Sequence, residues 1–523
     1  MTRFPPPGKL LLLALLFSTW LGSAVGGEVL WSNQLSQAVD LAGSSGTGVL
    51  VADAGRGVVL SLTATDPNEL AARSFSLPVD RLRGRYVFLS AEVKATGVSP
   101  KPHPWNGIKV MARVDTPAGS EWPQAELPTG SFDWQRCSRR FWVPATATAV
   151  TLSLGLEQVT GRAWFREVRL VLAKEAAAAP AAPADTPVFC GHSEPRLRGV
   201  MVAPDTLNEN DLAVLARDWG GNLIRWQLVR TGAPANESNF ENYDRWLDGQ
   251  LRQLDRGLTW AARLGVKVAL DLHSPPGGGV VSGYQAAIGS FWTNPNAQNK
   301  FLEAWRRIAA RYRGDQRIWG YDLVNEPADD NVTEDCDDWQ TLALRAGQAI
   351  RSIDPQRTLI VEPPSWGNAS GFSRFQPVAL PNVVYSFHFY EPHAFTAQGV
   401  DGASPAQAYP GQIDGAWWDK SALERALEPA TAFASRYRVS MYVGEFSVIR
   451  WAPGGEKYLS DLIDLLESRG WDWSYHAFRE WDGWSVEHGA DKNDHTPTIQ
   501  PTARKQVLLQ GLGKNKNENG TNR

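Results

Sequence analysis

Short alternating strand-like runs, then eight β-α units, predict an all-β jelly roll or sandwich followed by an α/β barrel of the (β/α)8 (TIM) type. The length of 523 residues agrees with more than one core. In residues 28–173, apolar and polar residues alternate between turn signals, without a long helical pattern. An Ala- and Pro-rich segment at 174–187 predicts a linker between the two domains.

The amino terminus has the pattern of a secretory signal peptide at residues 1–26. Arg3 and Lys9 flank the start of a short apolar run, and small residues follow it, so we expect cleavage after Gly26. The run is too short to span a bilayer, and no later stretch approaches the roughly 18 apolar residues that a membrane helix requires. We therefore expect an exported protein, extracellular or periplasmic, without membrane contact after cleavage.

The second half of the first domain carries a resemblance. Its runs at 133–157 and 161–172 resemble the carbohydrate-binding-module jelly rolls that accompany secreted polysaccharide hydrolases. The resemblance implies structural roles for three tryptophans: Trp134, Trp142 and Trp164. Trp105 and Trp122 lie in Pro-rich loops and are the better candidates for stacking on sugar rings. A packing module that binds no sugar is the alternative.

The second domain, residues 188–513, contains eight strand-like runs. They lie at 197–203, 222–229, 266–273, 318–326, 358–364, 383–391, 440–448 and 471–478. Helical patterns that end in Gly, such as 243–265 and 456–470, separate most of them, although no convincing helix lies between the fifth and sixth runs. A doubly wound sheet is the weaker alternative to a barrel. Residues 514–523 indicate a polar tail.

Polar and charged residues gather at the carboxyl ends of these runs, where a barrel of this kind places its active site. In chain order they are Arg225, His273, Asn325, Glu326, His388, Tyr390 and Glu445. Glu326 and Glu445 end the fourth and seventh strands, on opposite sides of the barrel mouth, as glycoside hydrolysis requires. For Glu362 and Glu391, which also end strands, we favour a surface ion pair or a helix-cap contact.

Four motifs of the second domain resemble glycoside hydrolase family 5, a cellulase-type family of retaining (β/α)8 enzymes. They are LVNEP at 323–327, YVGEF at 442–446, DLHSPPGG at 271–278 and HFY at 388–390. The resemblance implies that Glu326 is the acid/base and Glu445 the nucleophile, about 5–5.5 Å apart. It also implies supporting roles: Arg225 and Tyr390 keep Glu445 ionised, Asn325 binds the sugar 2-OH, and His273 and His388 line the central subsite.

Tryptophan is abundant, with 23 residues against 4 methionines, which suggests that some indoles stack on sugars. Trp481, just beyond the eighth strand, is the candidate floor of the sugar site, and Trp484 could replace it. Further aromatic residues on the upper loops predict a long cleft with several subsites: Trp292, Trp366, Trp417 and Trp418. For each of these, packing within its loop is the alternative.

The remaining signals limit the partners. A net charge of −4 gives no reason to expect nucleic acid. The acidic run at 328–338 lacks EF-hand spacing, so we prefer a solvated loop, with Asp337 and Asp338 at a helix start, to a calcium site. The three cysteines form at most one disulfide, for which Cys190 and Cys336 are candidates because both lie beyond the linker, and three buried free thiols are equally expected. We expect no metal and no cofactor.

The sequence thus predicts a secreted, monomeric, retaining β-glycosidase that cleaves β-linked glucan by double displacement. Its partner would be a β-linked polysaccharide or oligosaccharide. The alternatives are a β-mannanase or another β-glycosidase of the same family, and a non-catalytic polysaccharide-binding protein. The linkage and the choice between endo and exo action stay open at this stage.

Overall fold

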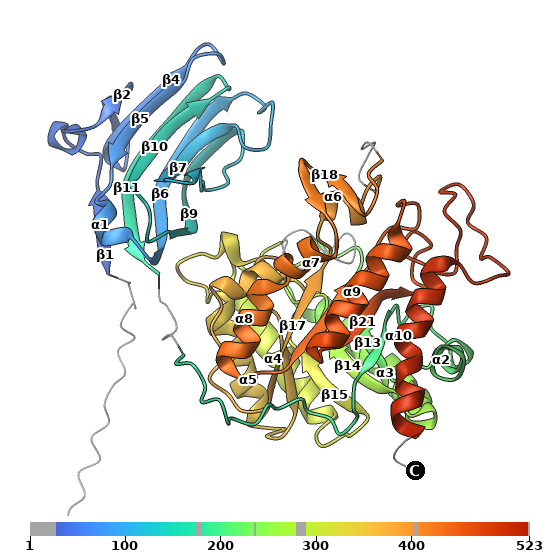
Figure 1. The fold of residues 1–523 in the computed structure, drawn as a ribbon. Coiled ribbons are helices and arrows are strands. Elements are labelled where there is room, and N and C mark those ends of the chain that lie inside the picture. Colours follow the sequence, from blue (N-terminus) through green and yellow to red (C-terminus); the bar gives the residue numbers. More distant parts are fainter. Residues whose placement is uncertain (1–27, 174–178, 235–236, 279–288, 401–405, 521–523) are drawn as a thin grey trace, which may run out of the picture.

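The computed structural model describes residues 28–173, 179–234, 237–278, 289–400 and 406–520 (Figure 1). Two bodies are visible: an all-β domain formed by the first range and a barrel surrounded by helices formed by the others. The expected signal peptide lies outside the described residues. No described helix is both long and apolar enough to cross a membrane.

The first domain is a sandwich of two antiparallel sheets, as its strand pattern predicts. One sheet has the order β3-β4-β11-β6-β9, with β1 paired to β11, and the other has the order β2-β5-β10-β7-β8. The strands are β1 (Val29–Asn33), β2 (Ser45–Gly46), β3 (Val49–Asp53), β4 (Gly57–Ala64), β5 (Ala71–Ser76), β6 (Arg85–Val98), β7 (Gly107–Thr116), β8 (Gly119–Glu121), β9 (Gly130–Val143), β10 (Ala149–Glu157) and β11 (Gly161–Leu172). Alternate residues such as Val150, Leu152 and Leu154 of β10 point into the core between the sheets.

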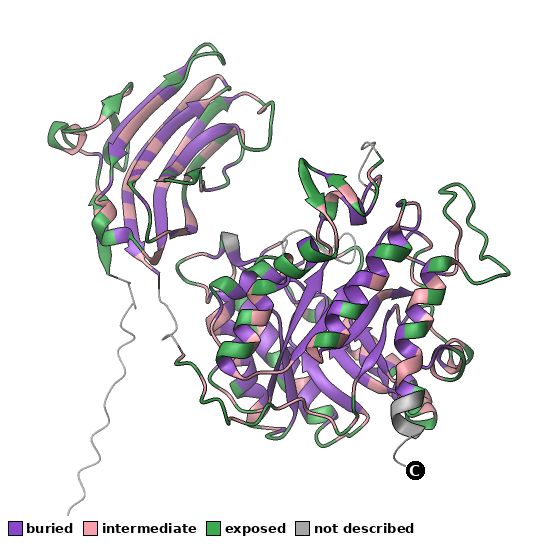
Figure 2. Ribbon diagram, viewed as in Figure 1, coloured by how far each residue is buried: buried purple, intermediate pink, exposed green. Residues whose placement is uncertain are grey.

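The second domain is a closed barrel of eight parallel strands, which confirms the predicted (β/α)8 class. The strands are β12 (Arg198–Val202), β13 (Leu223–Gln227), β14 (Lys267–Asp271), β15 (Ile318–Asp322), β16 (Thr358–Val361), β17 (Val383–Phe389), β20 (Met441–Phe446) and β21 (Asp472–Phe478). Each strand lies within the run predicted for it. Figure 2 shows the strands buried along their length, whereas the surrounding helices expose their outer faces.

The helices around the barrel follow the amphipathic patterns. They are α2 (Glu209–Ala213) with the π-helix η2 (Val214–Trp219), α3 (Glu241–Leu264), α4 (Pro295–Arg311), α5 (Trp339–Arg351), α7 (Lys420–Ala426), α8 (Glu428–Tyr437), α9 (Gly455–Arg469) and α10 (Ala503–Gly520). The left-handed Gly265 and Gly470 end α3 and α9. Between β16 and β17 there is only the 3-10 turn η4 (Ala369–Ser373), in the unit that lacks a helical pattern.

The remaining elements are short. They are η1 (Ala38–Leu41) and α1 (Val79–Leu82) in the first domain, and η3 (Asp329–Asn331), α6 (His393–Thr396), β18 (Gly411–Ile413) and β19 (Ala416–Trp418) in the second. Helix α10 continues past residue 514, where the sequence indicates a polar tail. The reason is Asn515, which is buried and accepts a hydrogen bond from Arg198 Nη1 at 2.8 Å.

The acidic run after β15 is solvated only in part: Asn331, Glu334 and Asp335 are exposed, but Asp329 and Asp338 are buried against the first domain. Arg140 of β9 forms ion pairs with Asp329 at 3.3 Å and with Asp338 at 2.9 Å, and its guanidinium lies 3.8 Å from the centre of the Tyr86 ring. Asp338 also caps α5 by accepting a hydrogen bond from the Thr341 N–H, as its position before the helix predicts. The buried guanidinium therefore ties the two domains together.

The three cysteines are free thiols, so Cys190 and Cys336 do not pair. Cys190 instead lies beside the bottom of the barrel, where its backbone carbonyl accepts a hydrogen bond from the Trp319 indole.

We expect Arg140→Ala to destabilise the contact between the domains by about 3–5 kcal/mol, because it leaves two buried carboxylates without a cation. Calorimetric unfolding measures this as a lower first transition temperature. The matched control is Arg113→Ala, which removes the exposed ion pair with Asp115 at 2.8 Å and should cost less than about 1 kcal/mol. Equal losses in the two variants would contradict the proposed role of the buried pair.

Candidate active site

A cavity with a volume of about 610 Å³ opens at the carboxyl ends of the barrel strands. Its walls include His273, Glu326, His388, Tyr390 and Glu445, so the structure brings these predicted site residues together. Three tryptophans also line it: Trp366, Trp481 and Trp484. Arg225 and Asn325 lie just beneath this surface, buried and in contact with one another.

Arg225 is the centre of the hydrogen-bond network below the cavity. It is fully buried on β13 and faces residues at the ends of four other strands: Glu445 at 2.5 Å, Asp322 at 2.9 Å, Glu362 at 3.1 Å, Asn325 at 3.1 Å and Asp271 at 3.2 Å. Burial opposes the charge of this guanidinium, but the surrounding carboxylates outweigh it and raise the pKa of Arg225 well above its usual value. The guanidinium therefore stays charged.

Glu445, on β20, is held as a carboxylate. Its Oε1 pairs with Arg225, and its Oε2 accepts a hydrogen bond from the Tyr390 hydroxyl at 2.9 Å. Burial alone would raise the pKa of Glu445. The positive charges of His388, His476 and Arg225 nevertheless hold this pKa well below its usual range. A carboxylate with these partners remains ionised and available for attack.

Glu326, beyond the end of β15, is in the opposite condition. Burial raises the pKa of its carboxyl, and the charges of Glu445 and Glu362 add to this, against the hydrogen bond between Glu326 Oε1 and His388 Nδ1 at 2.8 Å. Its backbone is left-handed, with φ +46°, and its N–H donates to Glu362 Oε2 at 2.9 Å. Glu326 therefore retains a proton more readily than Glu445 does.

The expectation that Glu362 forms a surface ion pair or a helix cap is wrong. Glu362 is fully buried and contacts Arg225, the Glu326 N–H and His388 Nε2, the last at 3.2 Å. Strand β16 ends at Val361, so the next side chain points into the barrel mouth rather than to its rim. Its position at a strand end was the signal, the same one that identified Glu326 and Glu445. Glu391, by contrast, lines the cavity wall and accepts a hydrogen bond from Asn368 at 2.9 Å.

The loop that follows β16 is tied to the same carboxylate. Gly367 has φ +64°, and a Cβ at this position would lie 2.4 Å from Glu362 Oε2. A side chain cannot be accommodated here without moving Glu362. The loop therefore depends on glycine at this one point.

Further residues of the network were not singled out for the site from the sequence. His476 Nδ1 lies 2.6 Å from the Tyr390 hydroxyl, and Glu480 accepts a hydrogen bond from Gln227 Nε2 at 2.9 Å. Carboxylates raise the pKa of His476 although burial opposes this, so the imidazolium can donate to Tyr390 while Tyr390 donates to Glu445. His476 lies within β21, where its position facing the barrel mouth was the available signal. Asp271 is another such residue, and its carboxylate lies 2.8 Å from His273 Nδ1.

The predicted stacking tryptophans separate into two groups. Trp366 and Trp481 are 44% and 42% exposed and line the cavity, as does the half-buried Trp484. The expectation for Trp292 is wrong: it is 2% exposed and packs against Phe291 and Trp339 in the barrel core. The others lie away from the residues that line this cavity: Trp417 and Trp418 on β19, and Trp105 and Trp122 on the first domain.

One oxygen each of Glu326 and Glu445 and one nitrogen of His388 lie within 4.8 Å of one another. Such a triad could hold a cation, but Arg225, Tyr390 and His388 already bond these carboxylates. One carboxyl with a raised pKa and another with a lowered pKa, side by side in a cavity, can donate a proton to a leaving group and attack the same substrate.

Comparison with known proteins places this geometry in context. A family model described as Cellulase (glycosyl hydrolase family 5) matches residues 184–481. Endoglucanase C from Acetivibrio thermocellus is 28% identical over 272 residues, covering 46% of this chain and 77% of that protein. Cellodextrinase A from Ruminococcus flavefaciens is 26% identical over 264 residues, covering 50% and 72%. A solved glycoside hydrolase gives a TM-score of 0.48 at 22% identity, covering 61% of this chain and 99% of that chain.

We expect Arg225→Met to lower the free energy of unfolding by about 3–5 kcal/mol near pH 7, because it leaves the buried carboxylates around it without their cation. The loss should shrink as the pH falls towards 5, since unpaired buried carboxyls have raised pKa values and take up protons there. Urea unfolding at both pH values measures this. Arg225→Lys, which keeps the charge, is the control, and a loss that is independent of pH would contradict the electrostatic explanation.

Proposed function

This chain belongs to glycosyl hydrolase family 5 and is a glycoside hydrolase, and we propose that it cleaves β-linked glucan with retention at the anomeric carbon. The observation that carries the proposal is the separation of Glu326 and Glu445, of which one oxygen each lies within 4.8 Å of the other. This supports the retaining spacing of about 5–5.5 Å between carboxyl groups rather than the roughly 6.5–9.5 Å that admits a water in inverting enzymes.

In the proposed first step, Glu445 attacks the anomeric carbon while Glu326 gives its proton to the departing glycosidic oxygen. The C–O bond breaks, and a glycosyl ester forms on Glu445. In the second step Glu326, now a carboxylate, takes a proton from water as the water attacks the same carbon and releases Glu445. The raised pKa of Glu326 and the lowered pKa of Glu445 support this division of roles.

Asn325 supports the proposed substrate contact. Its Oδ1 accepts a hydrogen bond from Arg225, whereas its buried Nδ2 has no hydrogen-bond partner among the described residues. A buried donor without a partner is costly. We infer that Nδ2 donates to a hydroxyl of the bound sugar, which for the ring attacked by Glu445 is the 2-OH.

The substrate class rests on two observations. The cavity combines exposed indole faces, Trp366 and Trp481, with polar residues, which suits the apolar faces and the hydroxyl rim of a sugar ring. The relatives named endoglucanase and cellodextrinase support a glucan rather than a mannan. Export follows only from the pattern at residues 1–26, and we propose it on that basis.

We expect Glu445→Ala to lower the rate of hydrolysis about 10⁴-fold or more, and Glu326→Ala about 10²- to 10⁴-fold, on the polymer that the wild type cleaves. The assay is a panel of β-glucans and β-mannans with product chromatography. The control, Glu424→Gln, removes an exposed carboxylate on α7 that pairs with Arg469, and it should be fully active.

Other outcomes of this panel would change the proposed substrate, the proposed activity or the proposed mechanism. Cleavage of β-mannan alone would replace glucan as the substrate, and binding without cleavage by the wild type would favour a non-catalytic binding protein. Initial products of inverted configuration, detected by NMR, would overturn the retaining mechanism.

We expect kcat/KM of the wild type to rise with pH through the lowered pKa of Glu445 and to fall through the raised pKa of Glu326. His388 lowers the pKa of both carboxyls, so His388→Gln raises both and should move both limbs of the profile to higher pH. His103→Gln, on the first domain, is the control and should leave the profile unchanged. Limbs that do not move in His388→Gln would show that this imidazole does not set the two values.

A further inference from the structure

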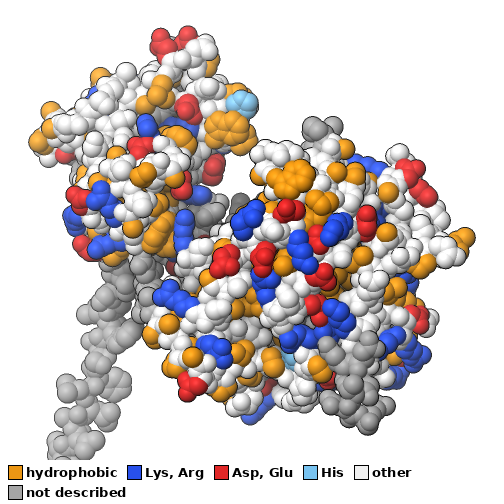
Figure 3. Space-filling model, in the orientation of Figure 1, with side chains coloured by type: hydrophobic (Ala, Val, Ile, Leu, Met, Phe, Trp, Pro, Cys, Tyr) orange, Lys and Arg blue, Asp and Glu red, His pale blue; other side chains and the backbone are white. Residues whose placement is uncertain are grey.

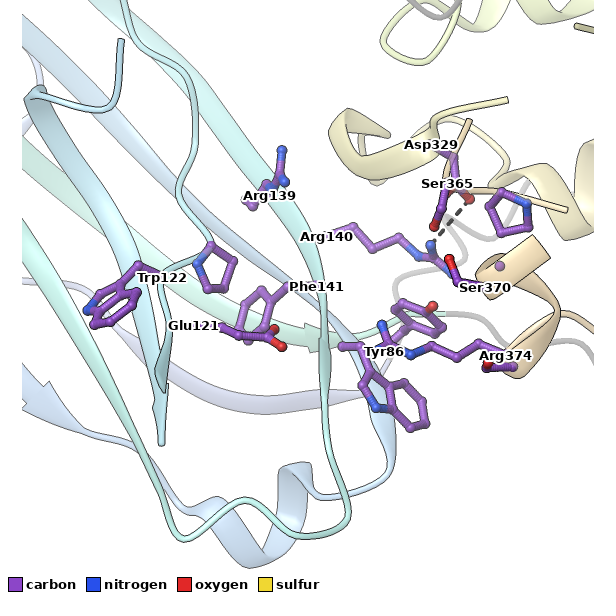
Figure 4. A pocket seen from close by; sticks show the side chains of 15 residues that line it. Tyr86, Glu121, Trp122, Arg139, Arg140, Phe141, Asp329, Ser365, Ser370 and Arg374 are labelled. Carbon is purple, nitrogen blue, oxygen red and sulfur yellow. Dashed lines mark hydrogen bonds and ion pairs between the residues drawn. The ribbon is translucent and has the colours of Figure 1, made fainter. Parts of the chain in front are cut away.

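A second cavity, of about 590 Å³, lies between the two domains (Figure 4). The first domain contributes residues of β6, β8, β9 and the loop after β8, among them Glu121, Trp122 and Arg139. The barrel contributes Asp329 and the segment that includes Ser365, Ser370 and Arg374. In the space-filling view the two domains stand apart above their contact, which leaves a notch between them (Figure 3).

The two cavities adjoin. Ser365 and Ser370 line both of them, so only the loop after β16 separates the cavity that contains Glu326 and Glu445 from the surface of the first domain. The shared loop lies beside the proposed acid, because Trp366 donates its backbone N–H to the Pro327 carbonyl at 3.1 Å. The departing oxygen must lie next to that acid. The second cavity therefore lies on the side of the leaving half of the substrate.

The wall of this cavity has the chemistry of a sugar subsite. Trp122 is 57% exposed and offers an indole face, while Ser370, Arg374 and Glu121 are exposed donors and acceptors for hydroxyl groups. The wall is also fixed in place, since Arg140 holds the two domains together through Asp329 and Asp338. A preformed polar wall with an aromatic face suits a chain of pyranose rings.

We propose that the cavity between the domains binds the leaving half of the glycan chain, so that the first domain forms the far end of the catalytic cleft. This inference rests on the proposed function and specifies its substrate: a β-glycan several rings longer than the part held in the barrel. Trp105, which is 59% exposed but does not line the cavity, has no part in this site.

The test compares Trp122→Ala with Trp105→Ala, which removes an equally exposed indole from the same domain. On the polymer that the wild type cleaves, Trp122→Ala should lower kcat/KM about 3- to 10-fold, mainly through KM, as the loss of one aromatic contact predicts. On an aryl glycoside of the corresponding disaccharide, whose leaving group is one small ring, it should match the wild type. Trp105→Ala should match the wild type on both substrates.

The cleavage position gives a second readout. The leaving half carries the reducing end, so on an oligosaccharide labelled at that end Trp122→Ala should shift cleavage towards the reducing end. A shift in the opposite direction would overturn the assignment to the leaving half. Arg374→Ala alters the same cavity from the barrel side and should weaken polymer cleavage in the same way.

Failure of this inference is distinct from failure of the proposed function. If the wild type cleaves the aryl glycoside and the polymer, but Trp122→Ala and Trp105→Ala behave alike on the polymer, the cavity inference is wrong and the function stands. If the wild type cleaves no β-glycoside, the function fails. Calorimetric titration of a β-glycan octasaccharide then decides the cavity, and equal affinities of the two variants overturn it as well.

Discussion

The site depends on one buried cation. Arg225 contributes a single guanidinium to Glu445, Asp322, Glu362 and Asp271, which come from four different strands. At these buried positions, carboxylates so close together could not remain charged without it. The guanidinium thereby sets both the positions of the strand ends and the ionisation of Glu445. His388 and His476 extend the same balance of charge towards Glu326 and Tyr390.

Much of the barrel could be predicted from local patterns. A parallel strand buried on both faces is a continuous apolar run, and the eight runs are separated by helices with a recognisable period. Once the runs are counted, the rule that active sites lie at their carboxyl ends identifies Glu326, Glu445 and Arg225. These inferences need no knowledge of tertiary contacts.

The wrong predictions concern residues whose burial is determined by tertiary contacts. The surface position predicted for Glu362 is wrong because nothing in the local sequence distinguishes a strand-end glutamate that faces Arg225 from one that faces water. Trp292 lies in a loop, but the start of α5 covers its ring, and that contact spans 47 positions (339 − 292). The acidic run at 328–338 reads as solvated because its partner, Arg140, belongs to the other domain. Each missing fact is a contact between residues distant in the sequence.

Gly367 links two properties that are usually considered separately. Its missing side chain leaves room for Glu362, which holds the backbone of the proposed acid, and the same loop presents Trp366 and Ser365 to the cavity at the barrel mouth. A drift of this loop that changed which glycans fit would also displace Glu362 and alter the acidity of Glu326. Substrate range and acid strength therefore cannot evolve independently through the backbone of this loop. Only the side chains of this loop that face the cavity can be substituted without moving Glu362.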